Sequence, residues 1–581
     1  MKHSNAIKYY FLSMCFFVPL FANSQGIEIT SGGKIEVTGA ASIEIIDGSF
    51  TNDGTYTKGT ETVTMSGTTP KSLLGSAGFN INNLVINSTG VISAASNLTV
   101  EALSVNPNAK LTLNTGKSLV ATNLNLLCTS GNQTGTFVNL GNVNATNVSV
   151  QKYLETGRNW YISSPVKKAT SNVFSANTLK PLYWYDEANG SSATLNWPKI
   201  TNTTTDLVPM RGYLCNLAGS GIVTFPGNAT DSLNSGNQST TVNRTTGQLK
   251  AGFNLVGNPY PSYVNIRTAT RTNLGSTYWY RSRNAANTAY IFDTYNIAMQ
   301  NGISLSGKSL TNYIPPLQAF WLQVDAGKSD GTLSFINTDL SHQDISNNIF
   351  RIPGVQKSNE NLLRLMITDG TNNDEALIYT NSSALLGYDI YDSPKMTNAN
   401  SAIPEIYTKA ITEKLAINGM NEFPLDTEIP LFFTSSKSEN YSISATESRF
   451  YEVKAILLDK LTAIQYEINS GFSHEFTSVQ TTDNNRFSLI FKPKNSPSAV
   501  EITDSDNEIL IYNGIDNKIN VLNKGSRNNL TINVYNALGQ KLISNNANCI
   551  LTTIDSQLKS GVYLVQVSNS NFSYVNKIKI N

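Results

Sequence analysis

Charged residues are scarce in this sequence. They account for 14% of the 581 residues, against about 25% in an average soluble protein. The net charge is +1, and no cluster of lysine and arginine builds a field that would gather phosphates. We therefore expect no nucleic-acid partner. Asparagine, threonine, serine and glycine replace the missing charges, a composition that favours extracellular β structure over cytosolic helices.

Cysteine and histidine are rarer still, with four and three residues in the whole chain. The cysteines lie far apart, at Cys15, Cys128, Cys215 and Cys549. Such scattered thiols indicate no disulfide framework. Only His342 and His474 follow the N-terminal segment. A tetrahedral zinc site needs clustered cysteine and histidine, so the sequence excludes one.

Recognisable catalytic motifs are also lacking. The sequence contains no Gly-x-Ser-x-Gly elbow, no His-Glu-x-x-His pair and no glycine-rich phosphate loop. Two histidines leave little room for a histidine-based triad. We therefore predict that the chain is not an enzyme and carries no cofactor. A glycosidase needs only two carboxylates across a sugar ring, so that class stays open.

The N-terminus has the pattern of a secretory signal peptide. Lys2 and Lys8 give a basic start, and the run from Tyr9 to Phe21 is apolar. Small residues follow, so we predict a signal peptide at 1–24 with cleavage between Ser24 and Gln25. No later stretch approaches the ~20 continuous apolar residues of a membrane helix. The mature chain is thus expected to have no transmembrane segment.

The length predicts about four domains, and the patterns predict a multidomain all-β protein. Residues 25–150 contain short segments of alternating polarity, such as Asn83–Ile86, Asn97–Val100 and Lys110–Leu113. Each has the length and period of a strand. Their regular spacing favours a β-solenoid, in which each rung covers the apolar face of the next. A β-sandwich is the alternative.

Residues 151–345 contain an internal repeat of aromatic and proline marks. The first copy carries them at 159–165, 183–185 and 212–225, and the second copy at 252–259, 278–280 and 319–335. The offset is 94 at the shared proline, Pro165 and Pro259. Aromatic and β-branched residues ended by proline, glycine or asparagine predict tandem β-sandwich-like modules.

The repeated aromatic residues have two interpretations. Trp184, Trp279 and Trp321 could form a platform on which sugar rings stack. Consecutive residues of a strand alternate between its faces, however, so part of each Tyr-Trp-Tyr triplet is expected to pack in the core. We favour packing and keep the platform as the alternative.

Residues 346–496 are predicted to form a further β domain. Its acidic residues are Asp369, Asp374, Glu375, Asp389 and Asp392. Carboxylates could hold a structural calcium ion, but the segment from Asp369 to Glu375 lacks the ligand spacing of an EF-hand loop. Asp-Gly is an ordinary turn signal. We favour a turn with solvated carboxylates.

Residues 497–581 carry the most specific pattern in the chain. Leu530–Leu542 reads L-T-I-N-V-Y-N-A-L-G-Q-K-L, Leu558–Val567 reads L-K-S-G-V-Y-L-V-Q-V, and the chain ends on K-I-K-I-N. Physically this predicts a small β-sandwich, in which turns at Gly539 and Ser560-Gly561 separate the strands.

This stretch resembles the type A sorting domain of type IX secretion cargo. The matching residues are Tyr535, Gly539, Gln540, Gly561, Val562, Tyr563 and Lys577. The resemblance implies that the type IX machinery is a partner and that the protein is exported to the outer-membrane surface or the extracellular space. It also implies removal of the tail and attachment to surface polysaccharide in many members.

The body of the chain, without the tail, leaves three functions open. We predict a structural or adhesive surface protein. The first alternative is a carbohydrate-binding surface protein that uses the repeated aromatic modules. The second is a polysaccharide-degrading enzyme, which would need a carboxylate pair in a cleft.

Overall fold

The computed structural model contains two compact units, Met1–Lys494 and Asn495–Asn581, each described by itself. It describes residues 26–131, 133–174, 182–192, 195–230, 232–284, 286–308, 310–342, 360–398, 402–435, 437–494, 509–513, 518–523, 528–547, 551–555 and 557–580. The regular elements in these ranges are strands and three short helices, η1 (Ser171–Phe174), η2 (Glu187–Asn189) and η3 (Asn337–Asp339). The predicted all-β class is thus confirmed. The predicted cleavage site, Ser24 and Gln25, lies outside the described residues.

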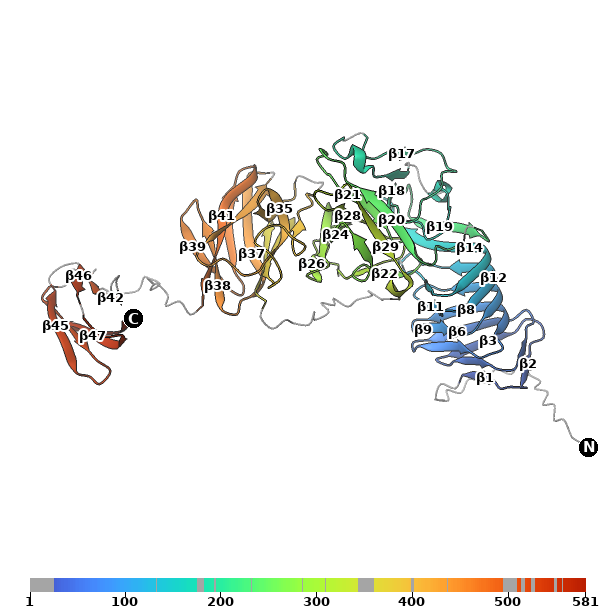
Figure 1. The fold of residues 1–581 in the computed structure, drawn as a ribbon, viewed down its shortest axis with the longest axis horizontal. Helices are drawn as coiled ribbons and strands as arrows, with labels where there is room; N and C mark the ends of the chain where they lie inside the picture. Colours follow the sequence, from blue (N-terminus) through green and yellow to red (C-terminus); the bar gives the residue numbers. More distant parts are fainter. Residues whose placement is uncertain are drawn as a thin grey trace, which may run out of the picture. The chain divides into compact units, whose positions relative to one another are not determined.

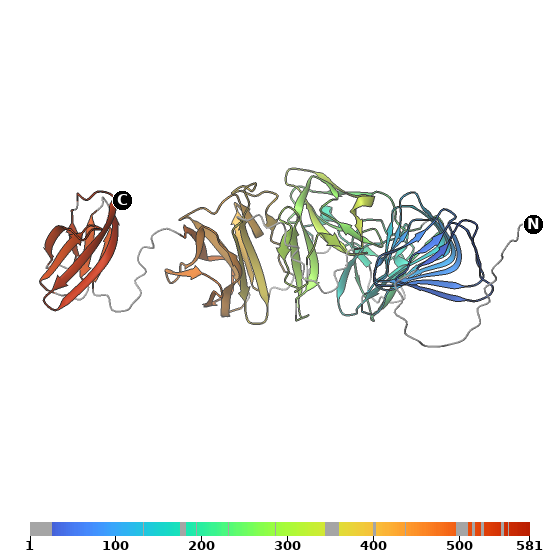
Figure 2. The same cartoon turned by 90° about the horizontal axis from the view of Figure 1, so that it is seen from below.

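The first unit begins with a β-solenoid of parallel strands, whose stacked rungs are visible in Figures 1 and 2. One sheet consists of β1 (Ile27–Ile29), β4 (Phe50–Asn52), β7 (Lys71–Leu74), β9 (Val91–Ala94), β11 (Lys110–Leu113) and β13 (Thr136–Asn139). The other contains β3 (Ser42–Ile46), β6 (Thr62–Gly67), β8 (Phe79–Ser88), β10 (Leu98–Val105), β12 (Ser118–Leu126) and β14 (Asn142–Leu154). Two short strands, β2 (Lys34–Glu36) and β5 (Thr55–Thr57), form a separate parallel pair. In the chain β2 follows β1, and β5 follows β4.

Equivalent side chains stack from rung to rung along the solenoid. Leu84 pairs with Leu103, and Leu103 pairs with Leu124. All three leucines are fully buried. Because successive strand residues point to opposite faces, the same apolar position in every rung builds one continuous core. The parallel pairing confirms the solenoid prediction and excludes the sandwich alternative here, since a sandwich is built from antiparallel neighbours.

The last rung of the solenoid is shared with the first copy of the repeat. β14 pairs in parallel with β12 on one side, and its residues Asn147–Leu154 pair antiparallel with β19 (Gly221–Asn228) on the other. In the other sheet the last strand, β13, donates the backbone N–H of Phe137 to the carbonyl oxygen of Pro261 at 3.0 Å. The repeat therefore covers both final strands. A boundary at residue 150 falls inside β14.

The two copies of the repeat have the same order of strands. In the first, β15 (Asn159–Ile162), β18 (Tyr213–Asn216), β16 (Leu182–Trp184) and β17 (Lys199–Ile200) are neighbours in that order. In the second, the order is β21 (Phe253–Gly257), β28 (Ala319–Val324), β24 (Leu274–Arg283), β25 (Tyr290–Asn296) and β26 (Asn301–Ile303). In the first copy β18 lies between β15 and β16, and in the second copy β28 lies between β21 and β24. The last strand of each set in the sequence is therefore the middle strand of the three in space. The pairing supports a duplication.

The second copy contains two further small sheets. One consists of β20 (Gln238–Asn243), β29 (Asp330–Phe335) and β23 (Thr270–Thr272). The other consists of β27 (Tyr313–Ile314), β22 (Tyr263–Asn265) and β30 (Leu340–Ser341). The antiparallel pair of β20 and β29 corresponds to the pair of β14 and β19 in the first copy. In the first copy, therefore, the place of β20 is taken by β14, the last strand of the solenoid sheet.

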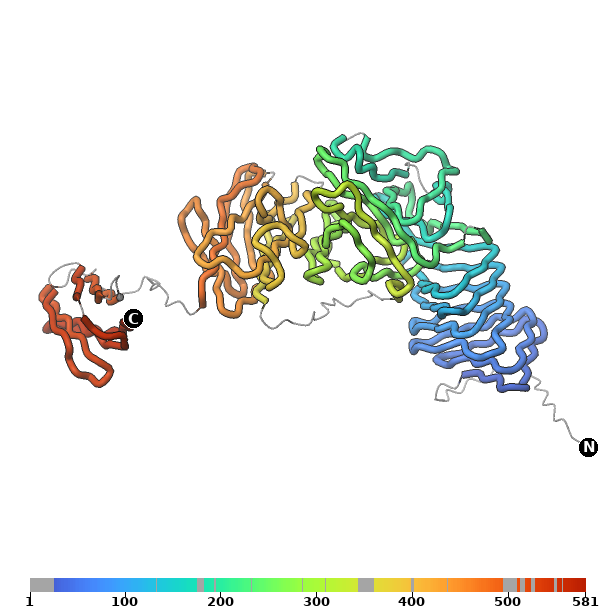
Figure 3. The backbone as a smooth tube through the Cα atoms, viewed as in Figure 1, coloured from blue at the N-terminus to red at the C-terminus, as the bar shows by residue number. Residues whose placement is uncertain are grey.

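Residues 362–493 form one long sheet that curls over its own core. Its strands are β31 (Leu362–Thr368), β32 (Asn373–Thr380), β33 (Ser393–Pro394), β34 (Glu405–Ala410), β35 (Glu413–Met420), β36 (Glu428–Ser435), β37 (Glu439–Arg449), β38 (Val453–Asp459), β39 (Ile464–Ile468), β40 (Ser473–Ser478) and β41 (Thr481–Pro493). β39 and β40 stand at opposite ends of the strand order, yet the rings of Tyr466 and His474 meet at 4.5 Å. Side chains from the two ends of the strand order therefore meet, and Figure 3 shows the course of these strands in orange.

His342 joins the end of the second copy to the solenoid. Its Nε2 lies 2.8 Å from the hydroxyl of Thr112 on β11, and its Nδ1 lies 2.8 Å from the hydroxyl of Thr136 on β13. Burial, together with the nearby charge of Lys110, lowers the pKa of His342 to about 3. The imidazole is therefore neutral at physiological pH and bridges two adjacent rungs.

The buried imidazole predicts a loss of stability in acid. The pKa in the folded state is below the value of about 6.5 expected for an unfolded chain. The contribution is therefore fully present above pH 6.5 and is lost as the pH falls toward 3. We expect a decline on the order of 2 kcal/mol in unfolding free energy between pH 6.5 and 5. Urea unfolding should show a shallower pH dependence for His342→Leu. An unchanged slope would contradict the assignment, and His474 titrates equally in both proteins.

Candidate functional site

The C-terminal unit is a small sandwich of two antiparallel sheets. One consists of β42 (Ile509–Asn513), β43 (Ile519–Asn523) and β46 (Leu551–Ile554). The other consists of β45 (Lys541–Ala547), β44 (Leu530–Tyr535), β47 (Gly561–Asn569) and β48 (Phe572–Ile580) in that order. Buried residues such as Ile511, Ile532, Val565 and Ile578 form the core between them. Alternation along each strand places every second residue inward.

The motif Asn536–Gln540 forms the turn between β44 and β45. Gly539 has a φ of 80°, a value that a residue without a Cβ adopts at little cost. The Asn536 side-chain oxygen accepts the backbone N–H groups of Leu538 at 3.0 Å and Gln540 at 2.9 Å. Its amide nitrogen donates to the Gln540 side chain at 2.8 Å. The asparagine, glycine and glutamine of the motif are therefore needed to close this turn.

Tyr563 in Leu558–Val567 and Tyr535 in Leu530–Leu542 point to opposite faces of the four-stranded sheet. Tyr563 points inward, is 9% exposed, and donates its hydroxyl to the carbonyl oxygen of Lys559 at 2.8 Å. This bond fastens the loop before β47, where Gly561 begins the strand. Tyr535 lies on the other face and donates its hydroxyl to the Gln566 side chain at 3.0 Å. Val562 and Lys577 share that outer face and are exposed.

Two family models match the chain. One, described as Secretion system C-terminal sorting domain, matches residues 513–581. The other, described as Domain of unknown function (DUF8693), matches residues 58–491, roughly three quarters of the chain. The chain belongs to this second family. No curated protein matches it.

The sorting match confirms the resemblance to type IX secretion cargo and supports export by that system. It also implies an interaction between the sorting domain and the type IX machinery. The DUF8693 match extends from the solenoid through both repeat copies to the end of the curled sheet. One family description thus spans three architectures. Among the described residues, no helix is long and apolar enough to cross a membrane.

The aromatic residues of the DUF8693 region lie mainly in its core. Trp279 is 1% exposed and Trp321 is 6% exposed. Because a sugar stacks on an open ring face, these two buried rings offer no platform, and the platform alternative is wrong for them. Trp184 is half-buried, and the Arg211 guanidinium lies 4.7 Å from the centre of its ring.

Several of these rings join the two repeat copies. Trp321 of the second copy packs edge-on against Tyr185 of the first at 4.7 Å and against Tyr161 at 5.9 Å. Such pairs add about 0.5–1.5 kcal/mol beyond their buried area. Backbone contacts run beside them, with Ile162 opposite Gln318 and Arg211 opposite Val256. In the first bridge the end of β15 meets the residue before β28, and in the second the end of β21 meets a residue just before β18. β15 and β21 are equivalent strands of the two copies, and so are β18 and β28. The contact therefore has pseudo-twofold character.

A buried carboxylate provides a second joint between the copies. Glu187, on η2 of the first copy, accepts the backbone N–H of Thr245 at 2.9 Å and that of Gly252 at 2.6 Å. It also accepts the Thr245 hydroxyl at 2.7 Å. Three donors can compensate for removing a carboxylate from water. No feature of the sequence around Glu187 indicated this contact.

The acidic residues of the curled sheet are held by donors of the chain itself. Asp369 accepts the backbone N–H groups of its own turn, as Asp-Gly predicts. Asp374 is fully buried and pairs with Lys395, so the expectation of a solvated carboxylate is wrong for this residue. Asp389 accepts the N–H of Tyr391, and Asp392 accepts that of Asp389. Among the described residues, no group of three or more His, Cys, Asp or Glu is arranged to hold a metal ion.

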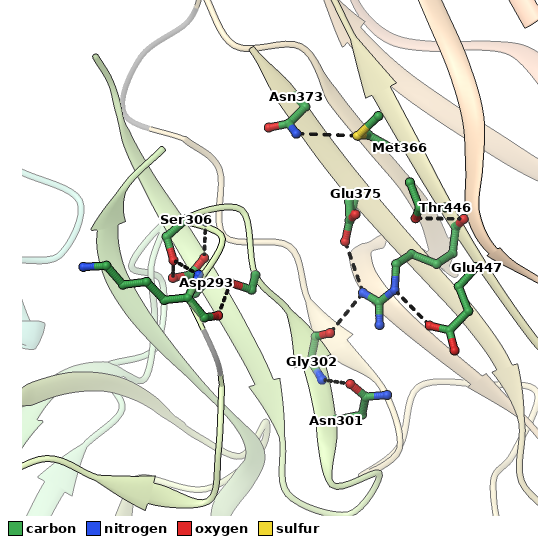
Figure 4. Close-up of polar contacts among 12 residues, drawn as sticks. Asp293, Asn301, Gly302, Ser306, Met366, Asn373, Glu375, Thr446 and Glu447 are labelled. Atoms are coloured by element: carbon green, nitrogen blue, oxygen red, sulfur yellow. Dashed lines mark hydrogen bonds and ion pairs between the residues drawn. The ribbon is translucent and has the colours of Figure 1, made fainter. Parts of the chain in front are cut away.

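Arg364 joins the second copy to the curled sheet. Figure 4 shows Glu375, Glu447 and the Gly302 carbonyl converging on one guanidinium. Arg364 donates to Glu375 at 3.1 Å and to the Gly302 carbonyl of β26 at 3.0 Å. Burial raises the pKa of the Glu375 carboxyl, and Arg364 opposes that rise. The joint thus depends on charge compensation in a place with little water.

The remaining sequence candidates are single buried groups. Cys128 and Cys215 are buried and free, and burial raises the pKa of both thiols. Cys549 lies outside the described residues. A pocket lined by Ile266, Tyr278 and other mostly apolar residues has a volume of ≈ 10 Å³, about the space that one water molecule occupies. That pocket is too small for a sugar ring.

The turn of the sorting domain predicts a ranked set of variants. Gly539→Ala should cost about 1 kcal/mol, because an added Cβ meets no atom within 4 Å and only the backbone strain is felt. Asn536→Ala should cost about 1–2 kcal/mol, because two backbone N–H groups lose their acceptor. The exposed Leu538→Ala is the control. Hydrogen exchange of β44 and β45 in the full chain measures the order, and equal protection in all three variants would contradict it.

The Arg364 joint predicts a pH-dependent defect. Arg364→Met leaves the buried Glu375 carboxylate without its guanidinium partner, which should lower the unfolding free energy by about 3–5 kcal/mol at pH 7. The deficit should shrink at pH 5, because protonation of Glu375 removes its uncompensated charge. Lys454→Met is the matched control, since its pair with Glu467 at 2.9 Å is partly exposed and should contribute less than about 1 kcal/mol. Equal losses in both variants would contradict the role of Arg364.

Proposed function

We propose that this protein is carried by the type IX system to the outer-membrane surface or the extracellular space, and that its body acts there as a non-catalytic structural or adhesive element. The observation that carries the export half is the sorting domain. It matches a secretion sorting model at 513–581 and forms a compact unit of its own. Its motif residues build a defined turn and sheet.

The use of polar and aromatic groups supports a structural role for the body. Trp321, a candidate for sugar stacking, holds neighbouring parts of the chain together instead, and so do two charged side chains that the sequence did not single out. Trp321 packs against Tyr185 of the other copy, Glu187 accepts donors from the other copy, and Arg364 joins the second copy to the curled sheet. A body fastened in this way can present a surface without internal rearrangement.

Two carboxyl groups in the body have raised pKa values, and burial is the cause in both. Burial raises the pKa of Asp392 to about 7 and that of Asp293 to about 6. Such shifts mark active sites in many enzymes. Here, however, Asp392 accepts the backbone N–H of Gly419 at 2.9 Å, and Asp293 accepts that of Ser306 at 3.0 Å. Both carboxyls therefore stabilise loops at the junction of the second copy with the curled sheet.

Deletion of the sorting domain tests the export half. A chain ending at residue 508 should accumulate in the periplasm of the producing bacterium, because the sorting information is gone while the body remains intact. Cell fractionation and surface labelling measure the distribution, and the full-length protein is the reference. Surface display of the deletion variant at the full-length level would refute the proposal.

A further inference from the structure

The motif residues of the sorting domain fall into two groups. Asn536, Gly539 and Tyr563 have contacts that the fold requires, in the turn and in the loop before β47. Val562 and Lys577 have no such contacts: both are exposed on the outer face of the four-stranded sheet. A residue that recurs in a motif without a structural need points to a binding role.

The register of the four strands places these residues in continuous rows. Lys541 on β45 pairs with Tyr535 on β44 next to a register shift, Tyr535 pairs with Leu564 on β47, and Leu564 pairs with Lys577 on β48. Directly paired residues share a face of the sheet. One transverse row therefore reads Lys, Tyr, Leu, Lys across the whole sheet.

Neighbouring rows extend this surface. Val562 pairs with Lys579, and Gln566 pairs with Val575. We call the surface formed by Tyr535, Lys541, Val562, Leu564, Val575, Lys577 and Lys579 the outer face. Its three aliphatic side chains are clearly open to solvent, with Val562 and Leu564 each 41% exposed and Val575 52% exposed. Adjacent apolar side chains on a solvated sheet cost free energy unless a partner covers them.

The charge of the domain indicates what the partner offers. Residues 509–581 contain six lysines and one arginine against two aspartates, although the whole chain has a net charge of only +1. Three of those lysines, Lys541, Lys577 and Lys579, flank the aliphatic centre of the outer face. An apolar centre with a basic rim is complementary to an apolar surface with an acidic rim.

We propose that the outer face of the β45-β44-β47-β48 sheet is the surface by which the export machinery holds the sorting domain, and that the docking protein presents an apolar patch rimmed by carboxylates. This inference rests on the proposed export function and adds the surface and the chemistry of the partner. The three-stranded sheet on the other side of the core is not part of the contact. Leu564 lies at the centre of the surface and the lysines steer the encounter.

Paired variants in the full-length chain test the surface. The first is Leu564→Thr combined with Lys577→Glu, which keeps β-propensity but removes the apolar centre and reverses one rim charge. The matched control is Leu551→Thr combined with Lys518→Glu: Leu551 lies on the three-stranded sheet and is 47% exposed, and Lys518 directly precedes β43. Leu564→Ile is the conservative variant. Urea unfolding of each purified protein measures whether the fold is kept.

Export in the producing bacterium is the readout. The outer-face variant should show at least a roughly tenfold loss of exported protein, which corresponds to about 1.4 kcal/mol of docking free energy, and should accumulate as a folded protein in the periplasm. The control and Leu564→Ile should be exported like the natural protein. Normal export of a folded outer-face variant, or an equal defect in the control, would overturn the proposal.

Two further outcomes distinguish a failure of the outer-face proposal from a failure of the proposed export function. If the chain ending at residue 508 is retained but the outer-face variant is exported, the surface assignment fails and the export function stands. If the truncated chain is exported as well, the export function fails. Sedimentation equilibrium tests for a second copy as the occupant: a dimer of the natural protein that the outer-face variant loses would also overturn the proposal.

Discussion

The body depends on how the backbone hydrogen-bonding groups at the end of the parallel solenoid are satisfied. Each rung exposes backbone N–H and C=O groups that the next rung satisfies, so the last rung needs a substitute partner. β19 pairs with β14 in one sheet, and Pro261 accepts from Phe137 in the other. The two repeat copies are therefore the cap of the solenoid as well as the next part of the chain. His342 reinforces this cap from the far end of the second copy.

Beyond the cap, the repeat copies are held to each other and to the curled sheet by a few desolvated groups. Trp321, Glu187 and Arg364 each lie where two parts of the chain meet. Groups of this kind are costly to bury alone and favourable only with their partners. They therefore favour one arrangement of the modules over alternatives of similar apolar area.

Much of the fold could be predicted because its signals are local. Period-2 alternation identified the solenoid strands, the spacing of aromatic and proline residues indicated two copies with the same strand order, and Gly539 and Tyr563 identified the sorting domain. The joints could not be predicted, because Thr112 and His342 are 230 residues apart and nothing near either residue indicates the other. Strand alternation favoured core packing for the repeated aromatic residues, but the segments that pack over Trp279 and Trp321 could not be predicted for the same reason. Leu564 was missed because an exposed aliphatic residue is ordinary in sequence and unusual only beside Lys577 and Val575.

The strand shared by the solenoid and the first copy has a mechanical consequence. Residues Asn147–Val150 of β14 are bonded on both sides, to β12 and to β19. A pull along this strand loads both ladders in shear at once, so many hydrogen bonds must break together rather than in succession. The solenoid and the first repeat copy are joined here by one continuous strand, β14, rather than by a linker. A body anchored at one end would thus carry force through this doubly paired part of β14.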